Sequence, residues 1–564
     1  MADAPRRPRG PGLVYAGVAA VMAVAIGAFT LTAVQQPPPT IAEFAPQAVE
    51  RIEEAPTEQS SGHGSGADGE CPPGVEGCEA VRPGAAPGGV PTAARIDVAR
   101  THRCVGTPPR QIEDPQSPPC VPYWDGDNGG ETARYGVTAD EIRVFIPTDG
   151  GQQAFFEGVR RFFNARFQLY GRQLVFVYGR NDIGTAVPET QKAEARGARD
   201  QNVFASNFYR ASQGFHYHEE LSRLGIVNVT GSLHPFPEPY LKTHGGFMWQ
   251  YYMDSDEMLR NYGEWACKRL IGEDADHAGP GTVGEPRVIG DIVQTYYDAD
   301  PTNSDEFVAE LKRCGHPVPP ARRIRNGVRT GGDQTSQVLG ADPATATNVV
   351  LKMQQEGVTT VACTCNLFTV GALMKAATNQ AYFPEWLVNT YGPSDINAAP
   401  ALGAWPPEQT EHTFGITVQP RQIRRENEPY WWAAKEGDPS YSDDGTWATV
   451  GNRVELYRPM LLLASGIQMA GPNLAPDTFE QGLQRTTFPN PDHPNMAGDV
   501  GFGPNLHSMT RDAAEFWFMN NGPTPYTGSD PATVCYLNGG TRYRYRGWSS
   551  GPGAFFEPPC DSGA

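Results

Sequence analysis

Residues 140–179 carry the pattern that most constrains how this chain of 564 residues can fold. Ile142, Val144 and Ile146 alternate in a β-branched run that stops at Pro147, and an Asp-Gly-Gly turn follows. Apolar residues, most of them phenylalanine, then recur at helical spacing before a second β-branched run begins. A strand, a helix and a strand with short joints form a right-handed βαβ unit, which seeds a parallel sheet. The chain is therefore expected to contain an α/β domain.

The alternation of strands and helices continues in two successive series. The predicted strands lie at 202–209, 226–232, 287–297, 321–328, 359–366 and 385–392, and the predicted helices at 188–201, 213–225, 258–272, 304–315, 345–357 and 368–380. Asp254 or Ser255 is the expected N-cap of the long helix that opens the second series. Two such series predict two doubly wound, Rossmann-like lobes with a cleft at the carboxyl ends of their strands.

The N-terminal segment indicates the compartment. Arg6, Arg7 and Arg9 precede an apolar run at 12–34, which exceeds the roughly 20 residues that a membrane span needs. The run is longer than the apolar part of a secretory signal, and no clear cleavage site follows it. We expect an uncleaved single-pass anchor, with residues 1–11 cytoplasmic and the bulk of the chain extracytoplasmic. A cleaved signal, which would make the protein secreted, is the alternative. Residues 35–134 are rich in proline and glycine and are expected to form a disordered linker.

The ten cysteines suit an exported protein, in which disulfides are the default. Cys363 and Cys365 lie two apart on a predicted strand and face the same way. Metal binding is the alternative for this pair and for Cys71 and Cys78, but no second pair at zinc-finger spacing accompanies either. The other candidates for disulfides, in chain order and taken two at a time, are Cys71 and Cys78, Cys104 and Cys120, Cys267 and Cys314, Cys535 and Cys560.

Charge and motifs argue against several classes of function. The net charge of −19 argues against a nucleic-acid partner, and the sequence contains no GxSxG, HExxH or P-loop motif. His216 and His218 lie two apart on a predicted helix, so they make a poor metal pair and are expected on a solvated face with Glu219 and Glu220. The segment 125–130 is expected to be a turn. We therefore expect no enzyme activity, no cofactor and no metal.

The succession of elements resembles the type I periplasmic binding proteins, in the branch that binds branched-chain amino acids and amides. The likeness is carried by YGVTADEIRVFIPTD at 135–149, by GGDQTSQV at 331–338 and by GVTTVACTCNLFTVGALMKAATNQ at 357–380, and it covers about residues 135–519. The resemblance implies two α/β lobes, 135–250 and 251–412, joined by a hinge. Residues 413–530 would complete the lobes and the hinge, with a strand at 413–420 and helices at 452–471, 478–485 and 508–521. Residues 531–564 would be a disulfide-tied extension.

By position in that fold, polar groups at the ends of strands would contact a ligand. A helix N-terminus suits a carboxylate, an acid such as Asp149 suits an ammonium, and tyrosines offer a stacking face. The departure from the family is at 208–210, where Phe208, Tyr209 and Arg210 replace the small residues expected there. The predicted ligand-binding residues are Asp149, Gly150, Gly151, Gln152, Ser206, Asn207, Tyr209, Thr230, Gly231, Ser232, Thr295, Tyr296, Tyr297, Asn366, Asn389 and Tyr391.

The sequence thus predicts a membrane-tethered solute-binding protein that closes over a small polar ligand, amino-acid-like or amide-like, by hinge motion. Its partner would be an ABC permease or another membrane protein. One alternative is a docking, assembly or sensor protein that reuses the same fold, favoured by the long stalk and the bulky residues near the cleft. An extracellular hydrolase is the less favoured alternative.

Overall fold

The structure is a computed structural model, and everything below refers to the residues that it describes. These are 104–105, 110–111, 114–122, 124–148, 150–179, 188–208, 215–231, 235–294, 305–325, 341–490, 497–528 and 532–562. The predicted anchor at 12–34 and most of the predicted linker lie outside them. Among the described helices, none combines the length and the apolar character needed to cross a membrane.

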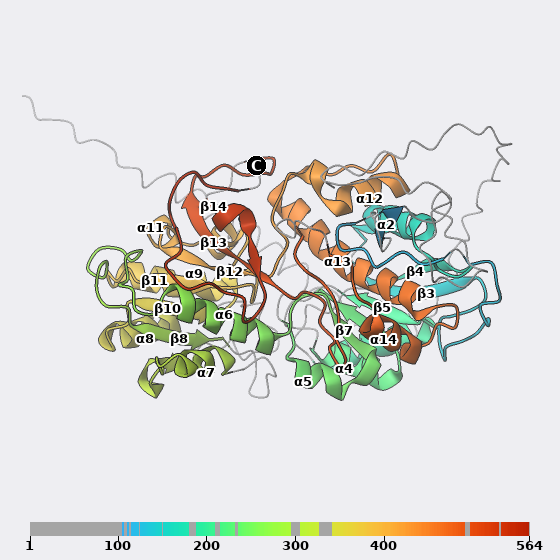
Figure 1. Cartoon of the computed structure of the whole chain (residues 1–564), viewed down its shortest axis with the longest axis horizontal. Coiled ribbons are helices and arrows are strands. Elements are labelled where there is room, and N and C mark those ends of the chain that lie inside the picture. Colours follow the sequence, from blue (N-terminus) through green and yellow to red (C-terminus); the bar gives the residue numbers. More distant parts are fainter. Residues whose placement is uncertain are drawn as a thin grey trace, which may run out of the picture. The chain divides into compact units, whose positions relative to one another are not determined.

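The first lobe contains a five-stranded sheet in which every pairing is parallel (Figure 1). The strand order is β4-β3-β5-β6-β7, so the chain winds outward from β3 in both directions. This confirms the parallel sheet predicted from the βαβ pattern. The strands are β3 (Glu141–Pro147), β4 (Gln173–Gly179), β5 (Ala205–Phe208), β6 (Val227–Thr230) and β7 (Met248–Gln250). Strand β7 escaped the sequence analysis because it is three residues long, fully buried and shows no alternation.

Helices flank this sheet, and they include elements from late in the chain. The early ones are α2 (Gln153–Arg166), α3 (Pro188–Asp200), α4 (Phe215–Leu224) and α5 (Glu238–Thr243). The late ones are α12 (Pro429–Gly437), α13 (Trp447–Ala470) and α14 (Pro476–Arg485). Helix α2 buries its phenylalanine face and packs on α12, where a Cβ at Gly437 would lie 1.8 Å from the carbonyl oxygen of Gly158. Only glycine allows two helices to come this close.

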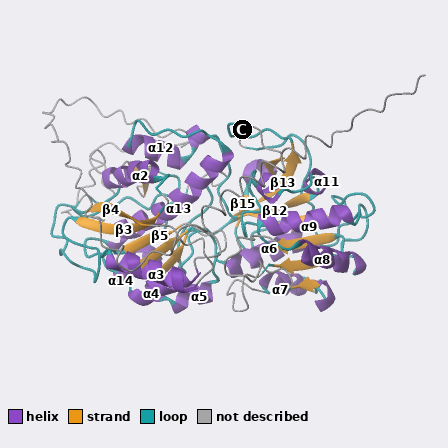
Figure 2. Ribbon diagram, turned by 180° about the vertical axis from the view of Figure 1, so that it is seen from behind, coloured by secondary structure: helices purple, strands orange, loops and turns teal. Residues whose placement is uncertain are grey.

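The second lobe repeats the same strand order and then extends it. Parallel strands run β9-β8-β10-β11-β12, and β13 and β14 continue the sheet in the antiparallel sense, with β15 also paired to β13. Helices flank these strands as well (Figure 2). The strands are β8 (Ile289–Val293), β9 (Arg323–Ile324), β10 (Thr360–Thr364), β11 (Glu385–Val388), β12 (Thr413–Thr417), β13 (Ala513–Asn520), β14 (Ala532–Tyr536) and β15 (Arg542–Tyr543).

The helices of the second lobe confirm one predicted cap. Asp254 accepts a hydrogen bond from the backbone N–H of Glu257 and so caps α6, as the sequence predicted. The helices are α6 (Ser255–Arg269), α7 (Glu306–Arg313), α8 (Pro343–Gln355), α9 (Leu367–Asn379), α10 (Ala399–Gly403) and α11 (Pro407–Thr410). A short ladder of β1 (Cys104–Val105) and β2 (Arg110–Gln111) precedes both lobes.

Three predictions from the sequence are wrong. The segment 35–134, predicted to be a disordered linker, contains residues that pack against the lobes: Asp114, Gln116 and Ser117 are buried, and the amide of Gln116 donates to the carbonyl oxygens of Ala497 and Gly498. The segment 508–521, predicted to be helical, contains β13, which lies between β12 and β14. Its inner residues are buried on both faces of the sheet, so apart from the buried Glu515 they are apolar and show no alternation that would distinguish a strand from a helix. His218 and Glu220 were predicted on a solvated face, but both are buried. His218 shares a hydrogen bond with Asn228 of β6 at 2.8 Å.

The chain crosses between the lobes three times. It runs from the first lobe to the second at 251–254, back to the first lobe at 418–428, and to the second lobe again at 486–512. Arg542 links the second and third of these segments, because its guanidinium donates to the carbonyl oxygens of Val418 and Gln419 and to the carboxylate of Asp512. The segment 507–510 runs beside 250–251 through backbone hydrogen bonds. Polar contacts between the crossing segments therefore fix the junction from which the lobes extend.

Disulfides join Cys267 to Cys314, Cys363 to Cys365, and Cys535 to Cys560. These bonds confirm the expectation that the cysteines form disulfides, and they exclude the metal alternative for Cys363 and Cys365. Cys120 is also disulfide-bonded, while Cys71 and Cys78 lie outside the described residues.

We expect the double substitution Cys535→Ala/Cys560→Ala to lower the free energy of unfolding by about 3 kcal/mol, because it frees a 25-residue loop in the unfolded chain. Cys363→Ala/Cys365→Ala should cost less, since that bond closes a loop of sequence separation 2. Urea unfolding of both variants measures the difference. Equal losses would show that loop length does not determine these contributions.

Candidate functional site

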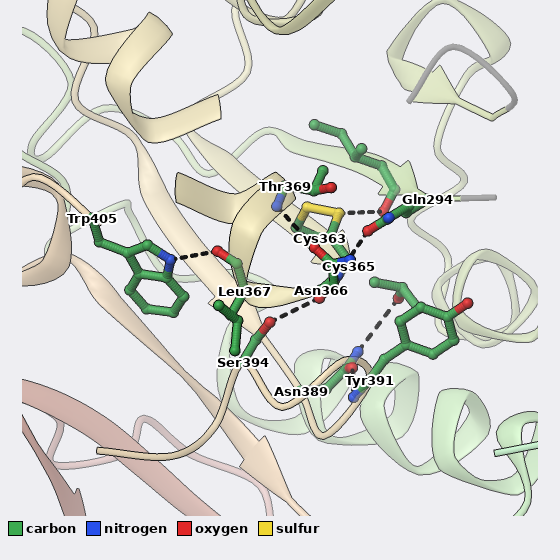
Figure 3. Close-up of a disulfide and its surroundings, with 12 residues drawn as sticks. Gln294, Cys363, Cys365, Asn366, Leu367, Thr369, Asn389, Tyr391, Ser394 and Trp405 are labelled. Atoms are coloured by element: carbon green, nitrogen blue, oxygen red, sulfur yellow. Dashed lines mark hydrogen bonds between the residues drawn. A yellow bond between two sulfur atoms is a disulfide. The ribbon is translucent and has the colours of Figure 1, made fainter. Parts of the chain in front are cut away.

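The carboxyl edge of the second sheet brings three predicted residues of that lobe, Asn366, Asn389 and Tyr391, near the disulfide between Cys363 and Cys365 (Figure 3). Asn366 caps α9 by accepting the N–H of Thr369 at 2.9 Å, and its own N–H donates to Gln294 Oε1. This cap follows from the sequence, since asparagine is a preferred N-cap residue. The polar groups of Asn366 at this edge thus hold the start of α9 in place.

Asn389 and Tyr391 lie at the same edge, after β11 (Figure 3). The amide of Asn389 donates to Thr364 Oγ1 at 3.3 Å and accepts the N–H of Tyr391 at 2.9 Å. Asn389, Tyr391 and Asn366 are all buried. The fold therefore brings these predicted residues together, but their hydrogen bonds join parts of the chain to one another and so stabilise the fold.

The predicted residues of the first lobe are divided between the sheet and its rim. Ser206 Oγ lies 2.8 Å from the hydroxyl of Tyr217, and Thr230 is also buried. Asn207 is buried too, and its Oδ1 has no hydrogen-bond partner among the described residues. Gly150 and Gly151 are exposed in the turn before α2. Asp149, Tyr209, Ser232, Thr295, Tyr296 and Tyr297 lie outside the described residues.

Two predicted residues, Gln152 and Gly231, lie against residues that line a pocket in a different part of the fold. The amide of Gln152 donates to Asn452 Oδ1 at 2.8 Å, and a Cβ at Gly231 would lie 3.1 Å from the carbonyl oxygen of Glu455. Both partners belong to α13 and line a pocket of about 200 Å³. None of the predicted residues that the structure describes lines it directly.

Segments from both lobes form the walls of this pocket. Residues between 393 and 402, which follow β11, form one wall, and residues between 419 and 428, which lead from β12 back to the first lobe, form another. The first turns of α13, from Trp447 to Glu455, close it together with Tyr526. The pocket therefore lies where the chain crosses between the lobes.

Two glutamic acids from different elements line this pocket. Glu428 directly precedes α12 and Glu455 lies inside α13, and their exposed fractions are only 3% and 7%. Burial raises the pKa of each to about 8. For Glu428, the nearby Arg458 and the N–H of Ile423 act in the opposite direction. Pockets that hold titratable groups so far from their usual range are candidate functional sites.

Pro459 lies one helical turn after Glu455 and shapes this part of α13. Proline has no N–H, so it cannot donate to the carbonyl of the residue four positions earlier, and that residue is Glu455. Gly231 approaches α13 at this same place, next to the Pro459 ring and the Glu455 carbonyl. The end of β6 thus packs against an irregular turn of α13 at the pocket.

The arginines near the pocket have acidic partners. Arg421, which lines it, forms an ion pair with Asp561 and donates to the carbonyl of Gly539. Arg458, which is buried and acts on the pocket residue Glu428, lies 3.5 Å from Asp114. Among the described residues, no group of three or more side chains could hold a metal ion.

Sequence analysis missed this pocket because no local sequence pattern marks its two glutamic acids as buried. Glu428 precedes the aromatic run at 430–432, and Glu455 lies in the run 452–471, where one acid would normally face solvent. The available signal was Pro459 within a strongly apolar helix, which marks a turn with an irregular hydrogen-bond pattern.

Comparisons with known proteins concern the fold. No protein-family model and no curated protein sequence matches the chain. Similar solved structures include a solute-binding protein of an ABC transporter from R. palustris in complex with 4-hydroxybenzoate, at 12% identity and a TM-score of 0.48, covering 70% of this chain and 96% of that one. A periplasmic binding protein type 1 from Bordetella pertussis Tohama I has 12% identity and a TM-score of 0.45, covering 69% and 99%. A possible leucine/isoleucine/valine-binding protein from Rhodopirellula baltica SH 1 has 14% identity and a TM-score of 0.45, covering 70% and 96%. All three are of the class whose fold the sequence resembles.

Proposed function

We propose that the chain is an extracytoplasmic solute-binding protein that captures a small ligand in the pocket at the lobe junction and delivers it to an ABC permease. The observation that carries this proposal is the position of the pocket. Its walls come from both lobes and from the segment 419–428 that joins them. A bound ligand would therefore contact both lobes and the segment between them. A ligand that binds both lobes stabilises the closed arrangement over the open one.

An anchor at 12–34 would fit this role. A span at the N-terminus, followed by the long linker, would keep the two lobes near a membrane permease while leaving them free to diffuse over it. The ligands in the names of the similar structures, hydroxybenzoate and branched-chain amino acids, are small enough for such a site. We propose no enzyme activity for the chain.

One observation favours a second candidate, a docking or sensor protein with the same fold. The pocket of about 200 Å³ is smaller than the roughly 300–1,000 Å³ of typical ligand sites. A protein that docks another protein binds it on its surface, so it does not need a pocket of the size that typical ligands occupy.

A pocket-filling substitution tests the proposed function. Gly451 lines the pocket, and a Cβ there would meet no atom within 4 Å, so Gly451→Phe should fill it without a clash. The full-length chain is screened by thermal shift against amino acids, amides, amines, aromatic acids and fatty acids. A ligand at one hundred times its dissociation constant should stabilise the wild type by about 2.7 kcal/mol. Gly451→Phe should abolish that shift.

Gly197→Phe is the matched control, because Gly197 lies inside α3, is exposed and also has no atom within 4 Å of its Cβ position. This variant should respond to the ligand as the wild type does. A well-folded wild type that shows no shift with any compound would contradict solute binding and favour the docking candidate.

A further inference from the structure

Residues 110–111 and 114–122, which we call the N-terminal arm, precede both lobes in the sequence but pack like core residues. Asp114, Gln116 and Ser117 are each at most 2% exposed. A turn orients this part of the arm, because Asp114 Oδ1 accepts the N–H of Gln116 at 2.7 Å and Ser117 Oγ accepts the N–H of Asp114 at 2.9 Å. Polar side chains are buried this completely where hydrogen bonds satisfy them. The partners of Gln116 therefore show what the arm holds together.

The side-chain amide of Gln116 makes hydrogen bonds in two directions. Its Nε2 donates to the carbonyl oxygens of Ala497 at 2.6 Å and Gly498 at 3.1 Å, which lie in the third crossing between the lobes. Its Oε1 accepts from the hydroxyl of Tyr251 at 2.6 Å, where the first crossing begins, and from the guanidinium of Arg458 at 3.1 Å. Arg458 belongs to α13, which packs on the first sheet. One amide thus joins the first lobe to two of the three crossings.

The third crossing carries this connection on to the second lobe. Its residues 499–501 pair with 509–511 in an antiparallel hairpin. Gly498 lies beside the buried ion pair of Arg542 and Asp512, since a Cβ at Gly498 would lie 2.8 Å from Arg542 Nε and 2.9 Å from Asp512 Oδ1. Arg542 is part of β15, which pairs with β13 in the second sheet. Gln116 is therefore linked to the second lobe through Gly498 and Arg542.

The same contacts reach two walls of the junction pocket. Arg458, the partner of Gln116 in α13, comes one turn after Glu455, which lines the pocket. Arg542 donates to the carbonyl of Gln419, which lines the pocket from the second crossing. The arm therefore supports the pocket from behind, on the side of α13 and on the side of the second crossing.

The other end of the arm is attached differently. Gln111 Oε1 accepts from Gln468 Nε2 at 2.9 Å, and Gln111 Nε2 donates to the carbonyl of Arg166 at 3.3 Å. Gln468 lies in α13 and Arg166 ends α2, so both of these hydrogen bonds stay within the first lobe. Gln468 also donates to the carbonyl of Pro119 at 3.1 Å. Gln111 thus fixes the arm to the first lobe, and Gln116 extends it to the crossings.

We infer that the N-terminal arm is a strap across the hinge, in which Gln116 holds the crossings between the lobes against α13. Hinge motion changes the backbone dihedrals of the segments that join two lobes. Here such a change at Tyr251 or Gly498 would break hydrogen bonds of a buried amide and leave its partners unsatisfied, which costs free energy. The strap therefore favours the arrangement of the lobes that the structure describes. This inference goes beyond the proposed function, and it holds whether or not the pocket takes a ligand.

Double electron–electron resonance on the full-length chain tests the strap. Spin labels are attached through noncanonical amino acids, which leaves the native cysteines unchanged. One label replaces Gly197, exposed in α3 of the first lobe, and the other replaces Leu351, 41% exposed in α8 of the second. Gln116→Met removes the donor and the acceptor but keeps the length of the side chain. We expect the distribution of distances between the labels to become about twofold broader, because arrangements that the strap disfavours become populated.

Gln111→Met is the matched control. It is the same substitution in the same arm at an equally buried glutamine, but the hydrogen bonds of Gln111 stay in the first lobe. This variant should lose stability and keep the distance distribution of the wild type. Gln116→Asn, which keeps the amide but is too short to reach both sets of partners, should broaden the distribution in the same direction if Gln116→Met does not fold.

A distribution that stays as narrow as that of the wild type in a folded Gln116 variant would overturn the inference. Equal broadening in Gln111→Met would also overturn it, because the effect would then come from lost stability of the arm and not from its link to the crossings. No ligand enters these measurements, so their outcome is independent of whether the protein binds a solute.

Discussion

Replacing Arg542 by methionine is expected to lower the free energy of unfolding by about 3–5 kcal/mol, as removal of one partner of a buried ion pair does. The side chain of Arg542 is fully buried and pairs with Asp512 at 2.7 Å. It also donates to the carbonyls of Val418 and Gln419, where the chain leaves β12 for the pocket. Methionine would leave a buried carboxylate uncompensated and these carbonyls without their donor. Urea unfolding followed by circular dichroism measures the loss.

Arg544→Met is the matched control. Arg544 lies two residues further along, and its ion pair with Asp499 is similar in length, at 2.8 Å, but its side chain is 60% exposed. Exposed pairs contribute about 0–1 kcal/mol, so this variant should be nearly as stable as the wild type. If both variants lost the same free energy, burial at the lobe junction would not be the cause.

The double substitution Glu428→Gln/Glu455→Gln is expected to stabilise the empty protein at pH 8, by roughly 4 kcal/mol for each group. Burial raises the pKa of both groups from 4.5 to about 8. Between these values the unfolded chain has lost protons that the folded chain still binds, so the contribution of these groups to stability falls as the pH rises. Glutamine cannot ionise, and the double variant escapes this loss.

The difference in unfolding free energy between the double variant and the wild type, measured from pH 4.5 to pH 8.5, isolates the two groups from all others. It should be small at the acidic end and grow with pH. A difference that does not change with pH would show that the carboxyls titrate normally. Stabilisation on removal of charged groups is typical of residues kept for function.

The sequence predicted the parallel sheets well, because each strand at their centre follows or precedes a helix with a clear apolar face. The run around Val144 and the helix that follows it appear as β3 and α2 within a few residues of their predicted bounds. The wrong helix at 508–521 shows where periodicity fails. A strand paired on both sides and buried on both faces, such as β13, has no polar alternation to reveal it.

The candidate site could not be predicted in the same way. The expected residues at strand ends were placed by position in the fold, and Asn366 and Asn389 do lie together there. The pocket, however, is built from segments between elements, and its acids come from positions 428 and 455. Their burial depends on how α12 and α13 pack on the first lobe, which is tertiary information that no local pattern carries.

Native mass spectrometry of the full-length chain tests the central claim, that the junction pocket holds a small molecule, and it does not require the ligand to be identified first. The wild type, Gly451→Phe and Gly197→Phe are each purified, incubated with a small-molecule extract of the culture and measured before and after denaturation. We predict a noncovalent adduct on the wild type and on Gly197→Phe that disappears on denaturation, and none on Gly451→Phe. An adduct of equal abundance on all three, or none on the wild type, would contradict the claim.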